Sequence, residues 1–574
     1  MLANAQIKRI LTQGEILTAE DFEKFSQEAG VAGKNLENYL TEKKIITPLL
    51  LYENVASFHK LPFIELKNQT IRKDVLFSIP EPIATTHGLV AFDSSDKEIK
   101  IAMTDPNDIE ILEFIKKKTG LIPKVHITSP DNIKEVLKQY HKSLKAEFDY
   151  LTGDKLKTDD QKDLKKLAED LPVVRIVDTL LEYSIIEGAS DIHIEPEEKD
   201  VLARYRIDGI LHNVMVLPKT VQSGIVARIK ILANLKVDEH RLPQDGRFKI
   251  ANDEHKVSFR VSIIPTFDGE KVVLRLLNEK AQVLTLEQLG LQPTALEVLK
   301  RNVEKPHGII LVTGPTGSGK TTTLYTVLNI LNTPEVNIST IEDPIEYRMQ
   351  HINQSQVNAK IGYTFASGLR AFLRQDPNII MVGEIRDQET AEIAIHAAMT
   401  GHLVLSTIHT NDAATTMPRL AKMGVPSFLI ATTVNVIIAQ RLVRKICPDC
   451  IQSYNMSSET IKDLEKLLDI ENILLSLEKE RAIINAKKGL ASLLFYRGKG
   501  CKHCNNTGYK GRIGIYEILE NNEKIADLIL RNQSAMDINR QSIADGMLTM
   551  IKDGFIKAKN GITTLEEVLR VTKE

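Results

Sequence analysis

The sequence predicts a mixed α/β protein built from several domains. Its 574 residues exceed what one hydrophobic core usually holds, so about three or four domains are expected. From about Thr285 to Gln440, apolar strand-like runs alternate with helix-like segments, which is typical of a parallel sheet. Upstream, the alternation in Val257–Ile263 indicates an antiparallel sheet with one solvated face. One chain is therefore expected to hold two kinds of sheet.

Composition narrows the possible functions. The formal net charge is −2, with 43% hydrophobic and 26% charged residues, so no domain-wide basic excess points to nucleic acid as a partner. No apolar run approaches the length of a transmembrane helix, and the N-terminal residues lack the order of a signal peptide. All four cysteines fall in two CxxC pairs, which suits a reducing compartment and a metal site. A cytoplasmic location is expected.

Four segments are predicted before the parallel sheet. Residues 1–60 are expected to form short helices, and residues 61–141 mix strand-like and helix-like runs into a small α/β module. Residues 142–170 are dense in charge and poor in apolar residues, so we expect a linker. Residues 171–282 are expected to form the antiparallel-sheet domain, with a helix from Pro172 through Glu187 and strands at 189–196, 201–209, 255–265 and 271–277.

The stretch Gly308–Val327 holds the clearest motif of the chain. Its core, GPTGSGKT, fits the pattern G-x-x-x-x-G-K-[ST], in which backbone N–H groups converge on phosphates, a lysine reaches the β and γ oxygens and a hydroxyl ligates Mg²⁺. An apolar strand precedes the motif and a helix follows, whose N-terminus favours an anion. A nucleoside triphosphate, ATP or a relative, is therefore expected to bind to Gly314, Pro315, Thr316, Gly317, Ser318, Gly319, Lys320, Thr321 and Thr322.

Carboxylates follow two later strands. After the apolar run Ile379–Val382 comes Gly383, where most such enzymes carry Asp, and the acid is displaced by one position to Glu384. Activation of a water molecule needs a carboxylate within hydrogen-bond reach of the attacking oxygen. The segment TIEDPIE, residues 340–346, offers three further carboxylates: Glu342, Asp343 and Glu346.

Two histidines flank another apolar strand. They are His402 and His409, in the segment GHLVLSTIHTND. Their spacing fits a role near the nucleotide, and it fits equally well two histidines that are satisfied by hydrogen bonds beside a strand.

The order of these motifs resembles the secretion ATPases of type II secretion and type IV pili. In that family the phosphate loop, IEDPIE, LRQDPN followed by GEIRD, and TGH…STIHTND are called Walker A, the Asp box, an atypical Walker B and the His box. The likeness covers about residues 170–574. It implies a RecA-like P-loop ATPase core over residues 285–574, a preceding α+β, PAS-like sheet domain and an N-terminal docking domain.

The resemblance also implies roles for the site residues. Lys320 and Thr321 hold phosphate and Mg²⁺, and Glu384 is similar to the Walker B acid, which makes it a second Mg²⁺ ligand. Glu346 is similar to the Asp-box acid that activates water, although the sequence does not decide which of the two carboxylates does so. His402 and His409 resemble the residues that sense the γ-phosphate.

Arginines are further candidates for the active site, because phosphoryl transfer needs cations beside the charge that develops on the transferred phosphoryl group. Arg370 and Arg374 lie four apart and are expected on one helix face. Single arginines are more often solvated surface charges. The resemblance favours the catalytic interpretation, because arginines at such places in similar enzymes face a nucleotide, some from a separate domain or a neighbouring subunit. The other candidates are Arg386, Arg419, Arg260 and Arg275.

The cysteine pairs predict a structural zinc site. Cys447 and Cys450 form one pair, and Cys501 and Cys504 the other. Two CxxC turns can each give two thiolates to a tetrahedral Zn²⁺ and leave no open position for water. A redox pair and inert thiols are the alternatives. We expect a zinc subdomain over residues 440–515, with an inserted helical pair at 457–490, and C-terminal helices over 521–574.

The N-terminal region carries no catalytic motif. The resemblance implies that it docks on the membrane platform, and that some family members bind cyclic di-GMP there. Arg9, Leu11, Gly14 and Leu17 resemble the first cyclic di-GMP motif loosely, but Lys44 stands where the second would have a glycine. Docking is therefore favoured over binding of that dinucleotide.

The sequence as a whole predicts a cytoplasmic, hexameric ATPase at the inner face of the cytoplasmic membrane. Type IV pilus assembly is favoured because the zinc site and the long N-terminal region are, in this family, features of assembly motors. The alternative is the type II secretion ATPase that drives pseudopilus assembly. A nucleotide-gated scaffold without useful turnover and a nucleic-acid motor are less consistent with these residues.

Overall fold

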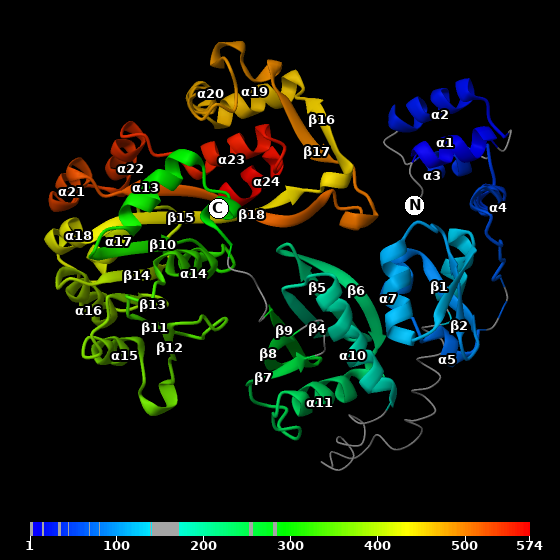
Figure 1. Ribbon diagram of the computed structural model, residues 1–574, viewed down its shortest axis with the longest axis horizontal. Helices are drawn as coiled ribbons and strands as arrows, with labels where there is room; N and C mark the ends of the chain where they lie inside the picture. Colours follow the sequence, from blue (N-terminus) through cyan, green and yellow to red (C-terminus); the bar gives the residue numbers. More distant parts are fainter. Residues whose placement is uncertain are drawn as a thin grey trace. The chain divides into compact units, whose positions relative to one another are not determined.

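The computed structural model divides into two compact units, unit 1 over Met1–Leu277 and unit 2 over Asn278–Glu574 (Figure 1). The helices of the described residues include none that is long and apolar enough to cross a membrane. The structure describes residues 4–13, 16–31, 36–43, 45–67, 69, 71–79, 81–137, 139, 171–251, 256–278 and 284–573.

Unit 1 begins with four short helices that enclose a small core. Ile7, Leu11, Phe22, Leu40 and Leu51 are buried together there. Thr47 caps the fourth helix by accepting a hydrogen bond from the N–H of Leu50 at 3.2 Å. The helices are α1 (Asn4–Gln13), α2 (Ala19–Val31), α3 (Leu36–Glu42) and α4 (Pro48–His59).

A three-stranded sheet follows. Its order is β1-β2-β3, with β1 and β2 antiparallel and β2 and β3 parallel. The parallel pair requires a crossover, and α7 supplies it. The elements are α5 (Lys73–Leu76), α6 (Glu81–His87), β1 (Leu89–Ser94), β2 (Glu98–Met103), α7 (Ile109–Thr119) and β3 (Ile122–Ile127). The expected linker at 142–170 lies outside the described residues.

The rest of unit 1 is a six-stranded sheet of order β6-β5-β4-β9-β8-β7 with two helices. In β8, Val257, Phe259, Val261 and Ile263 are buried, so the alternation seen in the sequence separates a core face from a polar face. No helix or strand was predicted from the sequence at β6, α11 or β7. The elements are α10 (Leu171–Ile186), β4 (Asp191–Pro196), β5 (Asp200–Ile207), β6 (Ile210–Pro218), α11 (Gln222–Leu232), β7 (Gln244–Ala251), β8 (Lys256–Thr266) and β9 (Gly269–Asn278).

Unit 2 is built on a seven-stranded sheet of order β12-β11-β13-β14-β10-β15-β18. Every neighbouring pair is parallel except β15 and β18, which are antiparallel. The strands are β10 (Gly308–Thr313), β11 (Ile338–Glu342), β12 (Ile352–Gln356), β13 (Ile379–Val382), β14 (Leu403–Ile408), β15 (Val434–Ile446) and β18 (Tyr509–Glu520).

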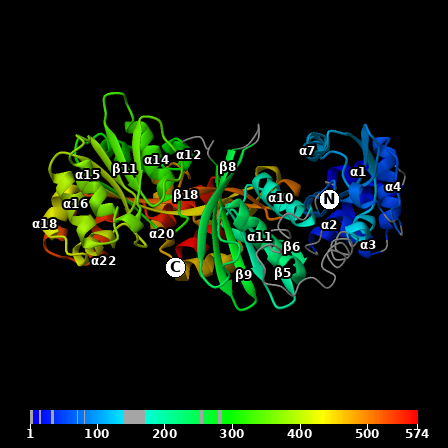
Figure 2. The same cartoon turned by 90° about the horizontal axis from the view of Figure 1, so that it is seen from below.

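Helices cover both faces of this sheet, which explains why its strands are continuously apolar. Ile309 and Leu311 of β10 belong to one core, whereas Ile310 and Val312 belong to the other. Figure 2 shows α14 and the pair α15 and α16 on opposite sides of the strands. The helices are α12 (Leu286–Leu289), α13 (Pro293–Val303), α14 (Lys320–Leu331), α15 (Phe365–Phe372), α16 (Gln388–Met399), α17 (Thr416–Lys422) and α18 (Ser427–Thr433).

The long antiparallel pair of β15 and β18 carries an insertion at its end. Both cysteine pairs lie in this insertion, together with the two-stranded sheet of β16 and β17. The predicted helical pair corresponds to α19 and α20, and the predicted C-terminal helices to α21 through α24. Their bounds are β16 (Ile451–Asn455), α19 (Ser458–Leu467), α20 (Ile470–Lys479), β17 (Leu494–Gly498), α21 (Glu523–Leu530), α22 (Ala535–Ala544), α23 (Met550–Lys559) and α24 (Leu565–Thr572).

Candidate active site and metal centre

The phosphate loop joins β10 to α14 at the carboxyl edge of the parallel sheet. Gly314 has φ 144°, and a Cβ there would lie 2.5 Å from the carbonyl oxygen of Gln440, so only glycine fits. Gly319 adopts φ 91° at the N-cap of α14, where no described side chain caps the helix. The N–H groups of the first turn therefore remain available to an anion.

Lys320 folds back onto its own loop. Its Nζ donates to the carbonyl oxygens of Gly314 at 2.8 Å and Pro315 at 3.1 Å. Burial lowers the pKa of Lys320, the nearby Glu384 carboxylate acts in the opposite direction, and Arg441 adds to the lowering. A phosphate that replaced these carbonyls would stabilise the ammonium further.

Gln440 on β15 anchors the phosphate loop through two hydrogen bonds. Its Nε2 donates to the carbonyl oxygen of Ser318 at 2.7 Å, and its Oε1 accepts from the hydroxyl of Thr323 at 2.8 Å. Gln440 was not predicted as a site residue, although one amide in the apolar run of β15 is a usable signal, because buried polar groups need partners.

Glu384 lies just beyond the end of β13 and is 9% exposed. It is ion-paired with Arg386, and His409 Nε2 lies 3.3 Å from its Oε2. A Cβ on the preceding Gly383 would lie 3.2 Å from the carbonyl oxygen of Ile341. This close approach of β13 to β11 explains the glycine at the position where an Asp was expected.

The segment after β11 brings a second carboxylate, that of Glu346, toward α14. The N–H of Glu346 donates to the hydroxyl of Tyr325 at 3.4 Å. Its Oε2 is buried and accepts no hydrogen bond from the described residues. Glu342 is 2% exposed and is enclosed by hydrogen bonds from Tyr325, Thr340 and Gln354.

Not every predicted residue reaches the phosphate loop. His402 precedes β14 at the opposite edge of the sheet, since Leu403 pairs with Gly308 and Ile408 with Thr313. There its Nδ1 lies 2.9 Å from the carbonyl oxygen of Ala397. For His402 the structure therefore favours the satisfied histidine over the nucleotide contact, whereas His409 lies at the carboxyl edge.

The expectation that Arg370 and Arg374 share a helix face is wrong. Helix α15 ends at Phe372, so Arg370 lies on the helix and Arg374 lies in the turn that follows it. Arg370 is ion-paired with Glu389, and Arg374 donates to the carbonyl oxygen of Arg370 at 3.2 Å. Arg419 lies on α17, where it forms no ion pair within the described residues.

Arg260 and Arg275 lie on the polar face of the sheet in unit 1. Arg247 stands directly opposite Arg260, and Asp191 pairs with both Arg275 and Arg206 in the ladder. Arg260 and Arg275 are equally far from the two-residue turn between β8 and β9, which places them opposite each other. We call these four side chains the arginine row: Arg247, Arg260, Arg275 and Arg206.

Among the described residues, Asp191 is the one carboxylate that forms ion pairs with the arginine row. Asp191 lies 3.0 Å from Arg275 Nε and 3.5 Å from Arg206 Nε. Neither Arg260 nor Arg247 has an ion-pair partner in the part of the chain that the structure describes. Like charges directly opposite in a sheet destabilise it, so this end of the row favours an anion.

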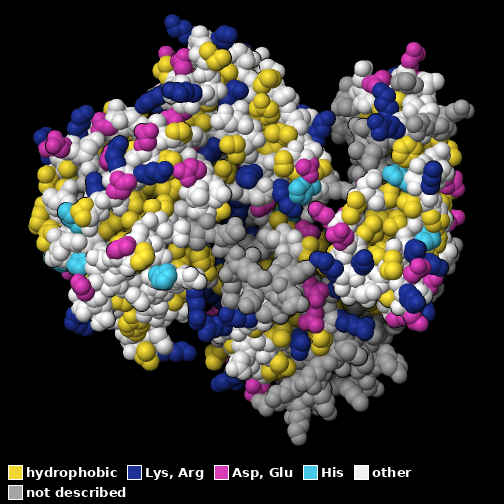
Figure 3. Space-filling model, viewed as in Figure 1, with side chains coloured by type: hydrophobic (Ala, Val, Ile, Leu, Met, Phe, Trp, Pro, Cys, Tyr) yellow, Lys and Arg dark blue, Asp and Glu magenta, His cyan; other side chains and the backbone are white. Residues whose placement is uncertain are grey.

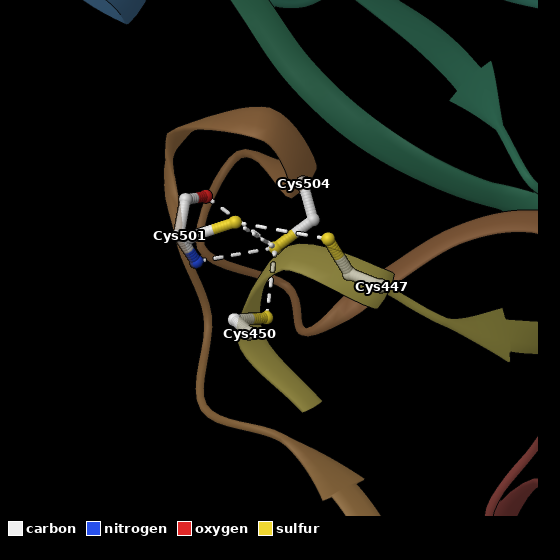
Figure 4. Close-up of side chains that lie close together, drawn as sticks. All are labelled: Cys447, Cys450, Cys501 and Cys504. Atoms are coloured by element: carbon white, nitrogen blue, oxygen red, sulfur yellow. Dashed lines mark hydrogen bonds between the residues drawn. The ribbon is translucent and has the colours of Figure 1, made fainter. Parts of the chain in front are cut away.

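The four cysteine sulfurs converge on one point, as Figure 4 shows. They lie within 4.8 Å of one another, with separations of 3.7 Å for Cys447 and Cys501, 3.8 Å for Cys450 and Cys504, and 3.7 Å for Cys501 and Cys504. A tetrahedron with Zn–S bonds of about 2.3 Å has edges of about 3.8 Å, so the four residues fit Zn²⁺.

The thiol of Cys504 accepts hydrogen bonds from two backbone N–H groups, whereas those of Cys447 and Cys450 each accept one. Burial raises the pKa of Cys447 to about 11 and that of Cys450 to about 12. Burial acts on Cys504 in the same direction, but the N–H groups of Cys501 and Gly508, each 3.2 Å from its sulfur, bring its pKa down to about 7. Such N–H donors stabilise a thiolate that binds metal.

The described residues of the loose cyclic di-GMP motif differ in burial. Leu11 is buried in the core of the N-terminal helices, whereas Arg9 is exposed. Gly14 and Lys44 lie outside the described residues.

Comparison with known proteins identifies the family. The model described as "Type II/IV secretion system protein" matches residues 166–570. The chain belongs to this family. A second model, the MshEN domain, matches residues 59–147. The resemblance noted in the sequence is thus confirmed.

Individual relatives add detail. The type IV pilus assembly ATPase PilB of Myxococcus xanthus is 37% identical over 99% of this chain and 98% of its own length. The type II secretion system protein E of Pseudomonas aeruginosa is 44% identical, over 72% of this chain and 78% of its own. The ATPase DotB of Yersinia pseudotuberculosis, at 21% identity, covers 70% of this chain and 93% of its own with a TM-score of 0.50. The predicted secretion ATPase is confirmed, and so is a mixed α/β chain with an ATPase fold.

Proposed function

We propose that this chain is the ATPase that powers assembly of type IV pilus filaments. The observation that carries the proposal is coverage: pilus assembly ATPases align with 99% of this chain, whereas two type II secretion relatives align with 72% and 83%. The secretion ATPase stays the alternative, since residues 166–570 match a model common to both systems.

The proposed reaction is hydrolysis of ATP at the phosphate loop, in a RecA-like core. Lys320 and the free N–H groups of α14 bind the β and γ phosphates, and Thr321 and Glu384 hold Mg²⁺. Mg²⁺, when bound, neutralises charge on the transferred phosphoryl group. Glu346 activates the water molecule, which is supported by its buried, unpartnered Oε2. His409, beside Glu384, contacts the γ-phosphate side of the site.

We infer that the arginine row supplies cations to a bound nucleotide in the assembled protein. The absence of an ion-pair partner for Arg260 and Arg247 among the described residues supports this role, and Arg275 stands next to them on the same face. Arg386, Arg370, Arg374 and Arg419 of unit 2 remain candidates for the same task. Because the row lies outside the ATPase core, hydrolysis would then depend on the position of another part of the assembly.

Further parts of the proposal follow the family. The four cysteines hold a structural zinc ion, with no open position for water. The protein forms a homo-hexamer in the cytoplasm, peripheral to the inner face of the membrane, and its N-terminal region docks on inner-membrane platform proteins. The sheet of residues 171–282 is the PAS-like domain. Binding of cyclic di-GMP stays the alternative role of the N-terminal region.

Nucleic acid is not proposed as a partner. On the face of unit 2 that Figure 3 shows, basic and acidic side chains are interspersed and form no continuous basic surface. Binding to a phosphate backbone relies on such a surface.

A chromosomal variant distinguishes type IV pilus assembly from type II secretion. In the source bacterium, the chromosomal Lys320→Ala variant should abolish surface pili while type II export continues. Loss of protein export with normal pili would overturn the proposal in favour of the alternative. Phosphate release by the purified chain separates a motor from a nucleotide-gated scaffold, which would bind ATP without turnover.

A further inference from the structure

Tyr325 stands where the phosphate loop helix meets the segment of Glu346. It lies on α14, one helical turn after Thr321, and its side chain is 0% exposed. Its hydroxyl donates to Glu342, and accepts from the N–H of Glu346 and from Gln354 Nε2, each at 3.4 Å. One hydroxyl therefore connects α14 to both ends of the acidic segment.

Glu342 acts as the anchor of this network. Thr340 Oγ1 donates to its Oε1 at 2.6 Å, and Gln354 Nε2 donates to the same oxygen at 3.2 Å. Burial raises the pKa of Glu342, and the hydrogen bonds from Thr340, Tyr325 and Gln354 oppose that rise. A buried carboxylate held by three donors is fixed in place and has no oxygen directed at a substrate.

Glu346 differs from Glu342 in its carboxylate. Its Oε2 is buried but accepts no hydrogen bond from the described residues, so its side chain is not fixed by an acceptor contact at that oxygen. Its peptide N–H is tied to α14 through the hydroxyl of Tyr325. The position of the Glu346 carboxylate relative to Lys320 and Thr321 therefore depends on this tie.

We propose that Tyr325 is a positioning residue for hydrolysis: its hydroxyl fixes the Glu346 segment to the helix that binds the phosphates. The inference rests on the proposed role of Glu346. A misplacement of about 1 Å in a reacting group can cost about 100-fold in rate. Loss of the hydroxyl should therefore reduce the chemical step and spare the binding of ATP.

A packing role for the ring is the competing explanation. Tyr325 packs edge-to-face on Tyr347, with ring centroids 4.6 Å apart. Tyr347 offers the matched control, because Tyr347→Phe removes a hydroxyl from the same aromatic pair, and the structure gives that hydroxyl no hydrogen bond to Glu342 or Glu346.

The experiment compares Tyr325→Phe and Tyr347→Phe in the full-length protein by steady-state phosphate release. Tyr325→Phe should lower kcat about 10- to 100-fold and leave KM for ATP within about 2-fold, whereas Tyr347→Phe should change neither by more than about 2-fold. Melting temperatures are measured so that turnover is compared where both variants are folded. Glu342→Gln, which keeps ring and hydroxyl but removes the anchoring charge, should lower kcat in the same direction.

A double variant shows whether Tyr325 acts through Glu346. In a Glu346→Gln background, Tyr325→Phe should cause little further loss, because the group that it positions is already gone. Full additivity, or an unchanged kcat for Tyr325→Phe beside a damaging Glu346→Gln, would overturn the positioning role alone. A harmless Glu346→Gln would instead overturn the role proposed for Glu346, and this inference with it.

Discussion

The cysteine cluster draws all four sulfurs from the insertion of unit 2, whereas the cations proposed for the phosphate loop come from both units. At the cluster, the ladder of β15 and β18 brings together two pairs that are 50 residues apart, from 451 to 500, and the geometry already fits the metal. At the phosphate loop, Lys320 contacts carbonyls of its own loop, and a buried oxygen of Glu346 accepts no hydrogen bond from the described residues.

We infer from this difference that the cysteine cluster is structural and that the phosphate site is a switch. On the proposal above, one unit alone supplies the metal ligands of the cluster. On the same proposal, the phosphate site is complete only when the arginine row reaches it in the assembly. The variants below should therefore affect the two sites independently.

Lys320→Ala should have the largest effect. Removal of the phosphate-binding ammonium should lower ATP turnover by at least about 100-fold, while the zinc content stays unchanged. Phosphate release checks the turnover, and metal analysis of the same preparation checks the zinc content. Lys422→Ala, an exposed lysine on α17, is the control and should behave as the unaltered chain. Loss of zinc in Lys320→Ala would show that the two sites are coupled.

Arg260→Ala should rank next. Turnover should fall about 10- to 100-fold because one cation is lost from the transition state, and the fold should persist because the side chain leaves a polar face. Steady-state hydrolysis and circular dichroism measure the two effects. Normal turnover in this variant would remove Arg260 from the site.

Cys447→Ser tests the cysteine cluster rather than the phosphate site. The unaltered chain should contain about one zinc ion per chain, and the variant should lose it. Proteolysis should then increase within residues 447–508, whereas the affinity for ATP should stay the same. Stoichiometric zinc in the variant would mean that the ligands are assigned wrongly.

Glu567→Gln should have the smallest effect. It tests whether α24 stabilises strand β15, which leads into the cysteine insertion. Glu567 on α24 is paired with Arg444 of β15 at 2.6 Å and with Arg570 at 2.9 Å. Burial acts to raise its pKa, but the hydrogen bonds from Arg570 and Arg444 lower it to about 2. The variant should lose about 1–3 kcal/mol in the free energy of unfolding at pH 7, measured by urea denaturation.

The depressed pKa also fixes the direction of the pH effect. The stabilisation by Glu567 is present above the ordinary carboxyl pKa of 4.5 and is lost as the pH falls toward about 2. Glu566→Gln, at the exposed neighbouring position, is the control. If both variants lose equal stability, the ion pairs of Glu567 are not the cause.

Much of the site was predictable because local chemistry dictates it. The full pattern G-x-x-x-x-G-K-[ST] between an apolar strand and a helix is typical of a phosphate-binding loop, so the positions of Lys320 and Thr321 followed from the spacing. Alternation in β8 placed Arg260 on the polar face for the same kind of reason. The CxxC turns predicted a cluster because two such pairs can supply the four thiolates of one tetrahedral zinc site.

Other features depend on long-range contacts that no local pattern contains. The sequence gives no sign that Tyr325 reaches Glu342, because a tyrosine on a buried helix face is an ordinary core residue. His402 and His409 look alike in the sequence, and only the direction of β14 separates them. Arg247 was missed because its strand was not predicted. Its place in the arginine row follows from the strand register, which sets it opposite Arg260.

The most direct test of the central claim uses unit 2 alone. A fragment from about residue 285 to 574 keeps the phosphate loop, Glu346 and Glu384 but lacks the arginine row. Circular dichroism and zinc content establish that the fragment is folded. It should bind ATP with an affinity within about 10-fold of that of the full chain, and hydrolyse it at least about 100-fold more slowly. Turnover equal to that of the full chain would contradict the account.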